Sequence, residues 1–509
     1  MTVIVQQSTD SNGNPQPMVY DSDTKKIIVD SEGYVLNGGS KLINVPTRAE
    51  YLTSPKTQTS GIQEALSYIN NNNDGKIVIK KGLYPLSVPL IYNIPTITKL
   101  GNTAPTVISP LNLQGEAFYL SQNKETLAGT VIYPTSAFPS GSPILTIGGS
   151  QSDNYEISFL NLQFLTFQCT KNGVTVAQND YSQNWASGVV IIGPANGMIQ
   201  NNYVIGANGD GMDILATNDG TGGNTLVINN NIVNASHNGI VAQIGDSTVA
   251  FNSIFFAGQG NPVYNNFVLG ITSSTGSAIN AIGNHINAAT CGIFATTGDA
   301  FILGNYVDGD LPTSNGMSVI TAMAGIAIVL GNYIISSAGL TGTSTTTGQI
   351  IALAGGSVYF EHNTIALQSD ILAWTVIFAD SGFAYVHRNN LISNGYSITN
   401  ILLNSGTYTY DSYIFEENVI DGIPYQPAPS TPSVPTSATA QENTNPYTVD
   451  VYLYGGTVTE IQITKNGTAY TVFSNSSGLA LSGQGYRLQP GDSITVTYTT
   501  APTWVWLGE

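Results

Sequence analysis

Charge is what this chain has least of. Asp, Glu, Lys and Arg make up 9% of the 509 residues, whereas 42% of the residues are hydrophobic. An ordinary soluble domain is about one-quarter charged. Helical bundles and coiled coils need Glu, Lys and Arg in bulk, and disordered chains are rich in charge, so both classes are excluded. Polarity must come from Ser, Thr, Asn, Gln, Tyr and the 54 glycines, which indicates an all-β protein.

Basic residues are especially scarce. The chain has 14 Lys and Arg against 32 Asp and Glu, for a net charge of −18. Between Lys171 and Lys465 the only basic residue is Arg388. A surface that binds phosphates needs clustered Lys or Arg, so we expect no nucleic-acid partner. The same scarcity argues against polyanionic glycans as substrates unless a metal ion bridges the carboxylates.

Cysteine and long apolar segments are also rare. The two cysteines, Cys169 and Cys291, cannot form a disulfide framework, and we expect two small buried side chains. Residues 1–7 lack the basic start and long apolar run of a secretory leader. Residues 317–336 are apolar enough to resemble a membrane span. They carry Gly331-Asn332-Tyr333 of the repeat described next, however, so we expect no membrane span.

What the chain does contain is an imperfect repeat of the form Asn-x-(Ile/Val). Most copies are about 20 to 30 residues apart, which is the period of a solenoid. The asparagines that we assign to the repeat are Asn202, Asn231, Asn252, Asn266, Asn284, Asn305, Asn332, Asn363, Asn390 and Asn418.

This repeat predicts a parallel β-helix. Short aliphatic runs such as Leu226-Val227-Ile228 separate the asparagines and would stack as ladders roughly 4.8 Å apart. Asn suits a tight turn because it tolerates left-handed backbone, and its amide can bond to its counterpart in the next coil. The one good helix precedes the repeats. Thr59 or Ser60 would cap it, and its apolar face would comprise Ile62, Ala65, Leu66 and Ile69.

The segment from that helix onwards resembles the entry of pectate-lyase-superfamily β-helices. The resemblance is carried by Gly61-Ile62-Gln63-Glu64-Ala65-Leu66, Gly75-Lys76-Ile77-Val78-Ile79, Gly82-Leu83-Tyr84, Asn112-Leu113-Gln114-Gly115-Glu116 and Gly129-Thr130-Val131-Ile132. It implies a right-handed parallel β-helix over roughly residues 45–423. It says little about activity, because that superfamily includes lyases, hydrolases, epimerases and viral tailspikes.

Two flanks surround the expected β-helix of residues 46–423. Residues 1–45 would form an N-terminal docking segment with a hairpin that pairs residues 26–29 with residues 34–36. Residues 424–438 are rich in Pro and Ser, as in a semi-rigid linker. Residues 439–509 alternate apolar and polar positions between glycine turns, which predicts a small β-sandwich.

Asn208-Gly209-Asp210-Gly211-Met212-Asp213 resembles the Asn-Thr-Asp-Gly-x-Asp segment of polygalacturonase-type inverting hydrolases. The resemblance implies catalytic roles for Asp210 and Asp213, with His237-Asn238-Gly239 approximating the His-Gly element of that family. Such chemistry needs one protonated and one ionised carboxyl. The chain lacks the Asp-Asp pair and the Arg-x-Lys element of the family. The alternative interpretation is that both aspartates are polar turn residues of a coil.

A second group of candidates comes from aligning the repeat. Two residues before Asn363, Asn390 and Asn418 stand Glu361, Arg388 and Glu416, which would stack in consecutive coils. One interpretation is a glycan-binding cluster that also includes His362 and Glu417. The other is a surface ion-pair ladder. The four histidines do not have metal-ligand spacing, so we expect no metal site and no cofactor.

Three functions remain compatible with these patterns. We favour a virion tailspike or fibre that attaches to host-surface glycans or glycoproteins, with or without cleaving them. The resemblance to tailspikes implies a homotrimer that binds other virion tail proteins through residues 1–45. The uncharged composition is also similar to that of structural proteins of spindle-shaped viruses of acidophilic archaea. The alternatives are a secreted polysaccharide hydrolase or lyase and a non-catalytic surface adhesin.

Overall fold

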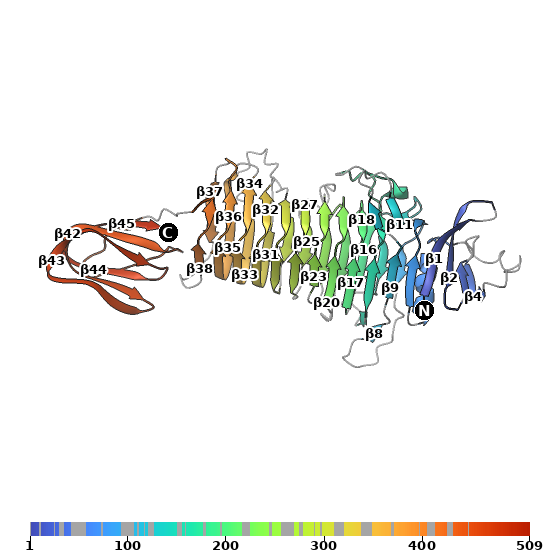
Figure 1. Ribbon diagram of the computed structural model, residues 1–509, viewed down its shortest axis with the longest axis horizontal. Helices are drawn as coiled ribbons and strands as arrows, with labels where there is room; N and C mark the ends of the chain where they lie inside the picture. Colours follow the sequence, from blue (N-terminus) through green and yellow to red (C-terminus); the bar gives the residue numbers. More distant parts are fainter. Residues whose placement is uncertain are drawn as a thin grey trace.

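The computed structural model describes most of the chain. Figure 1 shows a long shaft of stacked strands with an N-terminal group of strands at one end and a separate C-terminal sheet beyond the other. The described residues are 2–9, 12–24, 26–29, 35–41, 57–72, 75–92, 106–108, 111–116, 118–120, 127–149, 155–157, 159–176, 180–193, 196–215, 224–243, 247–255, 269–273, 278–289, 291–295, 298–309, 320–336, 349–367, 371–395, 398–404, 413–424, 431–445 and 447–508.

The shaft is a parallel β-helix, as predicted. Each coil contributes strands to rows that run along the molecule, and each strand pairs in parallel with its equivalent in the next coil. The first row comprises β5 (Gly75–Ile79), β9 (Leu111–Gly115), β14 (Leu160–Gln163), β17 (Asn196–Gln200), β20 (Asn224–Ile228), β23 (Ser247–Ala250), β26 (Ile279–Ile282), β29 (Ala300–Leu303), β31 (Ile320–Leu330), β33 (Gln349–Glu361), β35 (Ile371–His387) and β38 (Tyr413–Glu416).

A second row precedes the first within each coil. It comprises β7 (Leu90–Tyr92), β12 (Pro143–Ile147), β16 (Ser187–Ile192), β19 (Met212–Leu215), β22 (Ile240–Gln243), β25 (Leu269–Ser273), β28 (Cys291–Ala295) and β37 (Ile398–Asn404). In the later coils the two rows merge, because β31, β33 and β35 run through both without a break. Residues 317–336, which resembled a membrane span, contain β31 and the next row's β32 instead. No helix in the described part of the chain is long and apolar enough to cross a membrane.

The third row follows the turn that carries the repeat. Its strands are β6 (Gly82–Leu86), β11 (Leu127–Pro134), β15 (Thr166–Gln168), β18 (Tyr203–Ile205), β21 (Asn231–Val233), β24 (Ser253–Phe255), β27 (His285–Ala289), β30 (Tyr306–Gly309), β32 (Tyr333–Ser336), β34 (Thr364–Leu367), β36 (Asn390–Ile392) and β39 (Val419–Ile420). Smaller elements are β8 (Thr106–Ile108), β10 (Phe118–Leu120), β13 (Tyr155–Ile157), the 3₁₀ turn η1 (Lys171–Gly173) and β40 (Ile423–Pro424).

The repeat asparagines form a buried ladder along the shaft. In each coil the backbone N–H and the side-chain Nδ2 of the asparagine both donate to Oδ1 of the asparagine in the next coil; for Asn305 and Asn332 both distances are 2.9 Å. The same Nδ2 also donates to a carbonyl of the preceding coil. The members are Asn202, Asn230, Asn252, Asn284, Asn305, Asn332, Asn363, Asn389 and Asn418. The predicted amide-to-amide bonding is therefore confirmed.

Two repeat positions were assigned one residue too late. Asn230 and Asn389 belong to the ladder, whereas Asn231 and Asn390 are the first residues of β21 and β36. Asn266 lies outside the described residues. The tight-turn argument was also misplaced, because the left-handed residue is the one before each ladder asparagine. That position has φ near +55° in Asn201 and Asn229, and it is glycine at 283, 304 and 331.

The N-terminal residues close one end of the shaft. β1 (Thr2–Thr9) pairs in parallel with β5 and antiparallel with β2 (Pro15–Asp21). The expected hairpin pairing is present between β3 (Lys26–Val29) and β4 (Val35–Lys41), while its turn lies outside the described residues. Helix α2 (Ile62–Asn72) buries Ile62, Ala65, Leu66 and Ile69 against the same core, as predicted. The N-terminal strands are thus hydrogen-bonded into the body of the β-helix.

The predicted helix cap uses different chemistry. The Thr59 hydroxyl donates to the Glu64 carboxylate at 2.7 Å, and the Ser60 hydroxyl donates to the Pro85 carbonyl at 2.6 Å. Both hydroxyls are therefore engaged away from the N–H groups of the first turn. Gly61, which has φ +77°, directly precedes the helix.

The C-terminal residues form a second core. β42 (Val449–Lys465) pairs with β43 (Thr468–Leu488) along its whole length. On its other edge it pairs first with β45 (Thr503–Gly508) and then, beyond Gly455-Gly456, with β44 (Ser493–Thr500), which also pairs with β41 (Ala440–Glu442). The five strands form one sheet, in which β42 changes partner at a bulge, and the sandwich stays a prediction. Trp504 Nε1 donates to Pro432 O at 2.6 Å, so residues 431–435 of the expected linker belong to this module.

Candidate functional site

The structure brings Asp210, Asp213 and His237 together on the side of the shaft. His237 Nδ1 lies 2.6 Å from Asp210 Oδ1, and the backbone N–H of Asn238 donates to the same oxygen at 2.8 Å. Asp213 lies on β19 between Val190 and Val241 of the neighbouring coils.

Burial raises the pKa of Asp213 from its ordinary value to about 8. The Asp210 carboxylate adds to this by repulsion and by accepting a hydrogen bond from protonated Asp213. At neutral pH Asp213 therefore keeps its proton. A proton on Asp213 is what the predicted acid–base chemistry needs, and the catalytic roles of the two aspartates stay predictions. Direct contact, however, is shorter than the separation of about 6.5–9.5 Å that inverting glycosidases leave for a water molecule.

The glycines of the Asp210 motif have a packing role. A Cβ on Gly188 would lie 1.8 Å from the carbonyl oxygen of Gly211, and one on Gly211 would lie 2.7 Å from that of Gly239. The three glycines therefore stack where consecutive coils approach most closely. Close packing between coils therefore explains the glycines of Asp210-Gly211 and Asn238-Gly239 without a catalytic role. This agrees with the alternative interpretation, in which the motif is an ordinary polar turn of a coil.

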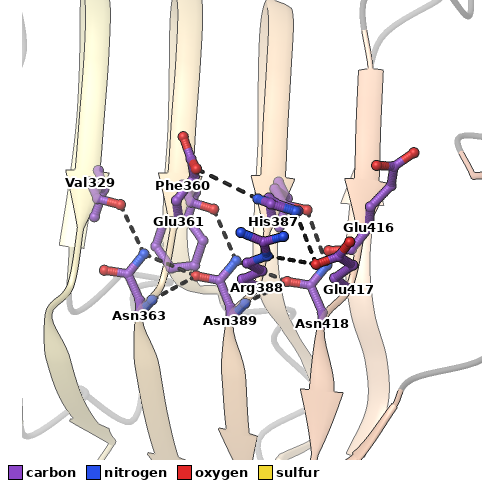
Figure 2. A network of polar contacts seen from close by, with 11 residues as sticks. Val329, Phe360, Glu361, Asn363, His387, Arg388, Asn389, Glu416, Glu417 and Asn418 are labelled. Atoms are coloured by element: carbon purple, nitrogen blue, oxygen red, sulfur yellow. Dashed lines mark hydrogen bonds and ion pairs between the residues drawn. The ribbon is translucent and has the colours of Figure 1, made fainter.

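A second cluster lies near the C-terminal end of the shaft, and we call it the carboxylate–tyrosine site. Figure 2 shows its charged members and the neighbouring asparagine ladder. The site comprises Tyr359, Glu361, His362, Tyr385, His387, Arg388, Glu416 and Glu417. The strand register places Tyr359 beside Tyr385, Glu361 beside His387, and His387 beside Glu416. The predicted row Glu361–Arg388–Glu416 is therefore wrong at its centre, because Asn389 rather than Asn390 is the ladder residue.

His387 is the residue at the centre of this site. Its Nδ1 lies 3.6 Å from Glu361 Oε2, and its Nε2 lies 3.5 Å from Glu417 Oε2. The residue is 8% exposed, and Nδ1 has no hydrogen-bond partner. The Tyr385 ring centroid lies 5.0 Å from the imidazole centroid. Aligning the copies of the repeat did not single out His387, Tyr359 or Tyr385. The signal was the adjacent pair Asn389-Asn390, because either asparagine could have been the ladder residue of this coil.

Arg388 lies one position further along the coil than predicted. Its Nε donates to Glu417 Oε2 at 2.6 Å, and this bond lowers the pKa of Glu417. Arg388 occupies the left-handed turn position together with His362 and Glu417 of the flanking coils, with φ of 52°, 52° and 51°. The three preceding coils have glycine at this position. Left-handed backbone costs an ordinary residue roughly 1–2 kcal/mol, and such strain gathers at functional sites.

Replacing His362 with glycine should therefore leave the free energy of unfolding unchanged or raise it by up to about 1 kcal/mol, since relief of the strained φ outweighs the added freedom of the unfolded chain. Denaturant titration measures this effect. Thr364→Gly, two residues later in extended β34, is the control and should lower stability by about 1 kcal/mol. Equal losses in both variants would contradict a strained turn.

The described residues contain no cluster of three or more His, Cys, Asp or Glu side chains that could hold a metal ion. Cys169 is a free, fully buried thiol, and burial raises its pKa, as expected for a small core side chain. The side chain of Cys291 lies outside the described residues.

Comparison with known proteins gives similarity of fold at low sequence identity. No family model matches the chain. No curated protein matches it either. A solved structure described as Geobacillus virus E2 ORF18 has 12% identity and a TM-score of 0.40, with 87% of this chain and 72% of that chain covered.

Two further solved structures are tailspikes. The tailspike of Acinetobacter phage vB_ApiP_P1 has 12% identity and a TM-score of 0.37, covering 98% of this chain and 96% of that chain. A tailspike variant of E. coli bacteriophage HK620, solved with a pentasaccharide, has 12% identity and a TM-score of 0.36, covering 94% and 91%.

Proposed function

We propose that the protein is a virion tailspike or fibre that attaches to glycans or glycoproteins on the host cell surface. The observation that carries this proposal is the carboxylate–tyrosine site. Sugars are recognised by aromatic rings that pack against their apolar faces and by charged groups that bond their hydroxyls. Tyr359 is 36% exposed, and its ring stands beside those of Phe383 and Tyr385. Glu361 and Arg388 lie within the same few coils.

The remaining parts of this proposal concern assembly. The protein acts outside the host cell as part of the virion, where the surface formed by β1 to β4 contacts other tail proteins. Three copies associate side by side along their shafts. The exposed side chains of Ile326 and Leu330, 42% and 40% accessible, support lateral packing of this kind. Light scattering behind a sizing column would give three times the chain mass of 53.6 kDa for such a trimer.

Attachment is tested with the full-length protein and intact host cells. We expect saturable binding that is inhibited by glycans released from the same cells. Tyr385→Ala should weaken binding by roughly tenfold, because loss of one stacking ring costs about 1–1.5 kcal/mol. Tyr470→Ala is the matched control, since Tyr470 is exposed in the C-terminal module, and it should bind like wild type. Equal binding by both variants would remove the carboxylate–tyrosine site from attachment.

A second candidate function is cleavage of the bound glycan, and the raised pKa of Asp213 beside Asp210 and His237 favours it. A carboxyl that stays protonated near pH 7 can act as a general acid. Asp213→Asn and Asp210→Asn should each reduce release of reducing ends from host polysaccharide by at least about 100-fold. Binding to cells should persist in both variants. If wild-type protein releases no reducing ends, the protein binds without cleaving.

The finer origin of the chain is part of the same proposal. Its charge-poor, tyrosine- and asparagine-rich composition supports a source among spindle-shaped viruses of acidophilic archaea. The entry motifs around Gly61 and Gly75 support descent from the pectate-lyase superfamily, since they form α2 and β5 at the first coil.

A further inference from the structure

We infer that the carboxylate–tyrosine site takes a non-acidic glycan, whose hydroxyl or amino groups donate hydrogen bonds to Glu361 and Glu416. This inference rests on the proposed function and names the class of sugar that the same site would accept. Acidic glycans, which carry carboxylate, sulfate or phosphate groups, are excluded.

The first argument is the balance of charge within the site. Glu361, Glu416 and Glu417 carry three carboxylates, and Arg388 is the only guanidinium among them. Arg388 uses one of its five N–H donors on Glu417, which its Nε bonds at 2.6 Å, so one cation faces three carboxylates. Among the described residues, neither Glu361 nor Glu416 forms an ion pair with Lys or Arg. The site therefore presents hydrogen-bond acceptors in excess, and its complement is a donor.

The second argument is the unsatisfied imidazole nitrogen. His387 Nδ1 is buried without a hydrogen-bond partner, and its 3.6 Å separation from Glu361 Oε2 is too long for a good bond. Buried polar atoms normally have a partner. Nδ1 is closed off from the surface, whereas the Glu361 side chain is 28% exposed, so a ligand meets Glu361 first. A sugar hydroxyl can donate to Glu361, whereas a carboxylate or sulfate can only accept and would be repelled.

The third argument is the aromatic surface beside these acceptors. Tyr359 and Tyr385 stand two residues before Glu361 and His387 on the same strands, a distance of roughly 6.7 Å along a strand. The two ring centroids lie 6.4 Å apart. A sugar ring against this pair would point its hydroxyls toward Glu361 and the imidazole.

The later coils of the shaft offer an acidic glycan no second basic residue. Arg388 is the only Lys or Arg between Lys171 and Lys465 in the whole sequence. Away from Arg388, an acidic sugar bound between Lys171 and Lys465 would lose hydration of its charge without a cationic side chain to replace it.

A glycan array that contains neutral, amino and acidic sugars tests this inference with the full-length protein at pH 7. We expect all bound glycans to lack acid groups. For the best neutral ligand, oxidation of its terminal C6 hydroxyl to a carboxylate should weaken binding at least about tenfold, as expected for a carboxylate facing Glu361. Glu361→Gln should weaken binding of the neutral ligand. In this variant the affinities for the neutral and the oxidised ligand should differ by less than about threefold.

Glu442→Gln is the matched control, because Glu442 is exposed on β41 of the C-terminal module, and it should leave both affinities unchanged. Thermal unfolding at the same midpoint as wild type shows that each variant is folded. Preferential binding of uronic, sialic or sulfated glycans, lost in Arg388→Gln, would overturn the inference and leave attachment to glycans standing. If no glycan is bound in any class, the proposed function fails and the inference fails with it.

Discussion

Replacing Asn305 with alanine should lower the free energy of unfolding by about 3–5 kcal/mol, since several buried polar groups would lose their partners at once. Asn305 Oδ1 accepts from both the backbone N–H and Nδ2 of Asn284, each at 2.9 Å. Its Nδ2 donates to the Ala281 carbonyl at 2.8 Å. All these groups are buried, so no water replaces the lost bonds.

Denaturant titration followed by circular dichroism measures this loss of stability. If refolding is incomplete, the unfolding rates of the variant and of wild type are compared instead. Asn280→Ala is the control, in β26 of the preceding coil. Asn280 points outward from β26 and makes one long bond, Nδ2 to Thr248 Oγ1 at 3.4 Å. We expect it to change stability by less than about 1 kcal/mol. Similar losses in the two variants would show that the ladder adds nothing beyond an ordinary surface amide.

Replacing Asp213 with asparagine should flatten the dependence of stability on pH. In the folded protein the pKa of Asp213 is raised to about 8 by burial and by Asp210, whereas the ordinary value is 3.8. The folded state therefore keeps a proton that the unfolded chain releases above about pH 4. The stability that this proton contributes is fully present below that pH and is lost as pH rises through about 8, by at most about 1.4 kcal/mol per pH unit.

The measurement is the free energy of unfolding from pH 4 to pH 9. Wild type should become less stable across this window, and Asp213→Asn should be the more stable of the two at pH 8. Glu442→Gln, on the exposed face of the C-terminal module, should keep the wild-type slope. A wild-type slope in Asp213→Asn would mean that another group holds the proton.

Much of the fold was predictable because the solenoid repeats a simple physical rule. Each coil needs one asparagine whose amide bonds the next coil and one aliphatic residue two positions later in the core. In the coil of Asn305 these are Asn305 itself and Val307, which is 0% exposed. Where the rule is met once per coil, as here, the sequence determines the register.

The errors occurred where the rule could be met twice. Asn389-Asn390 offers two asparagines, and only the three-dimensional register shows that Asn389 joins the ladder. This shift of one residue moves Arg388 to the turn and places His387 between the carboxylates of Glu361 and Glu417. The contact between Asp210 and His237 was predictable from the motif. The contact between Asp210 and Asp213 was not, because it depends on how deeply Val190 and Val241 bury the second carboxyl.

The two ends of the shaft also determine whether copies of this protein can associate end to end. A stack of parallel strands presents unpaired N–H and C=O groups at its last coil, and such edges can template endless addition of further copies. Here β1 covers the first coil, and the far end of the third row stops at β40, which pairs antiparallel with β39 and contains Pro424, a residue without an N–H to donate. A further copy therefore cannot extend the third row head to tail at this end of the shaft.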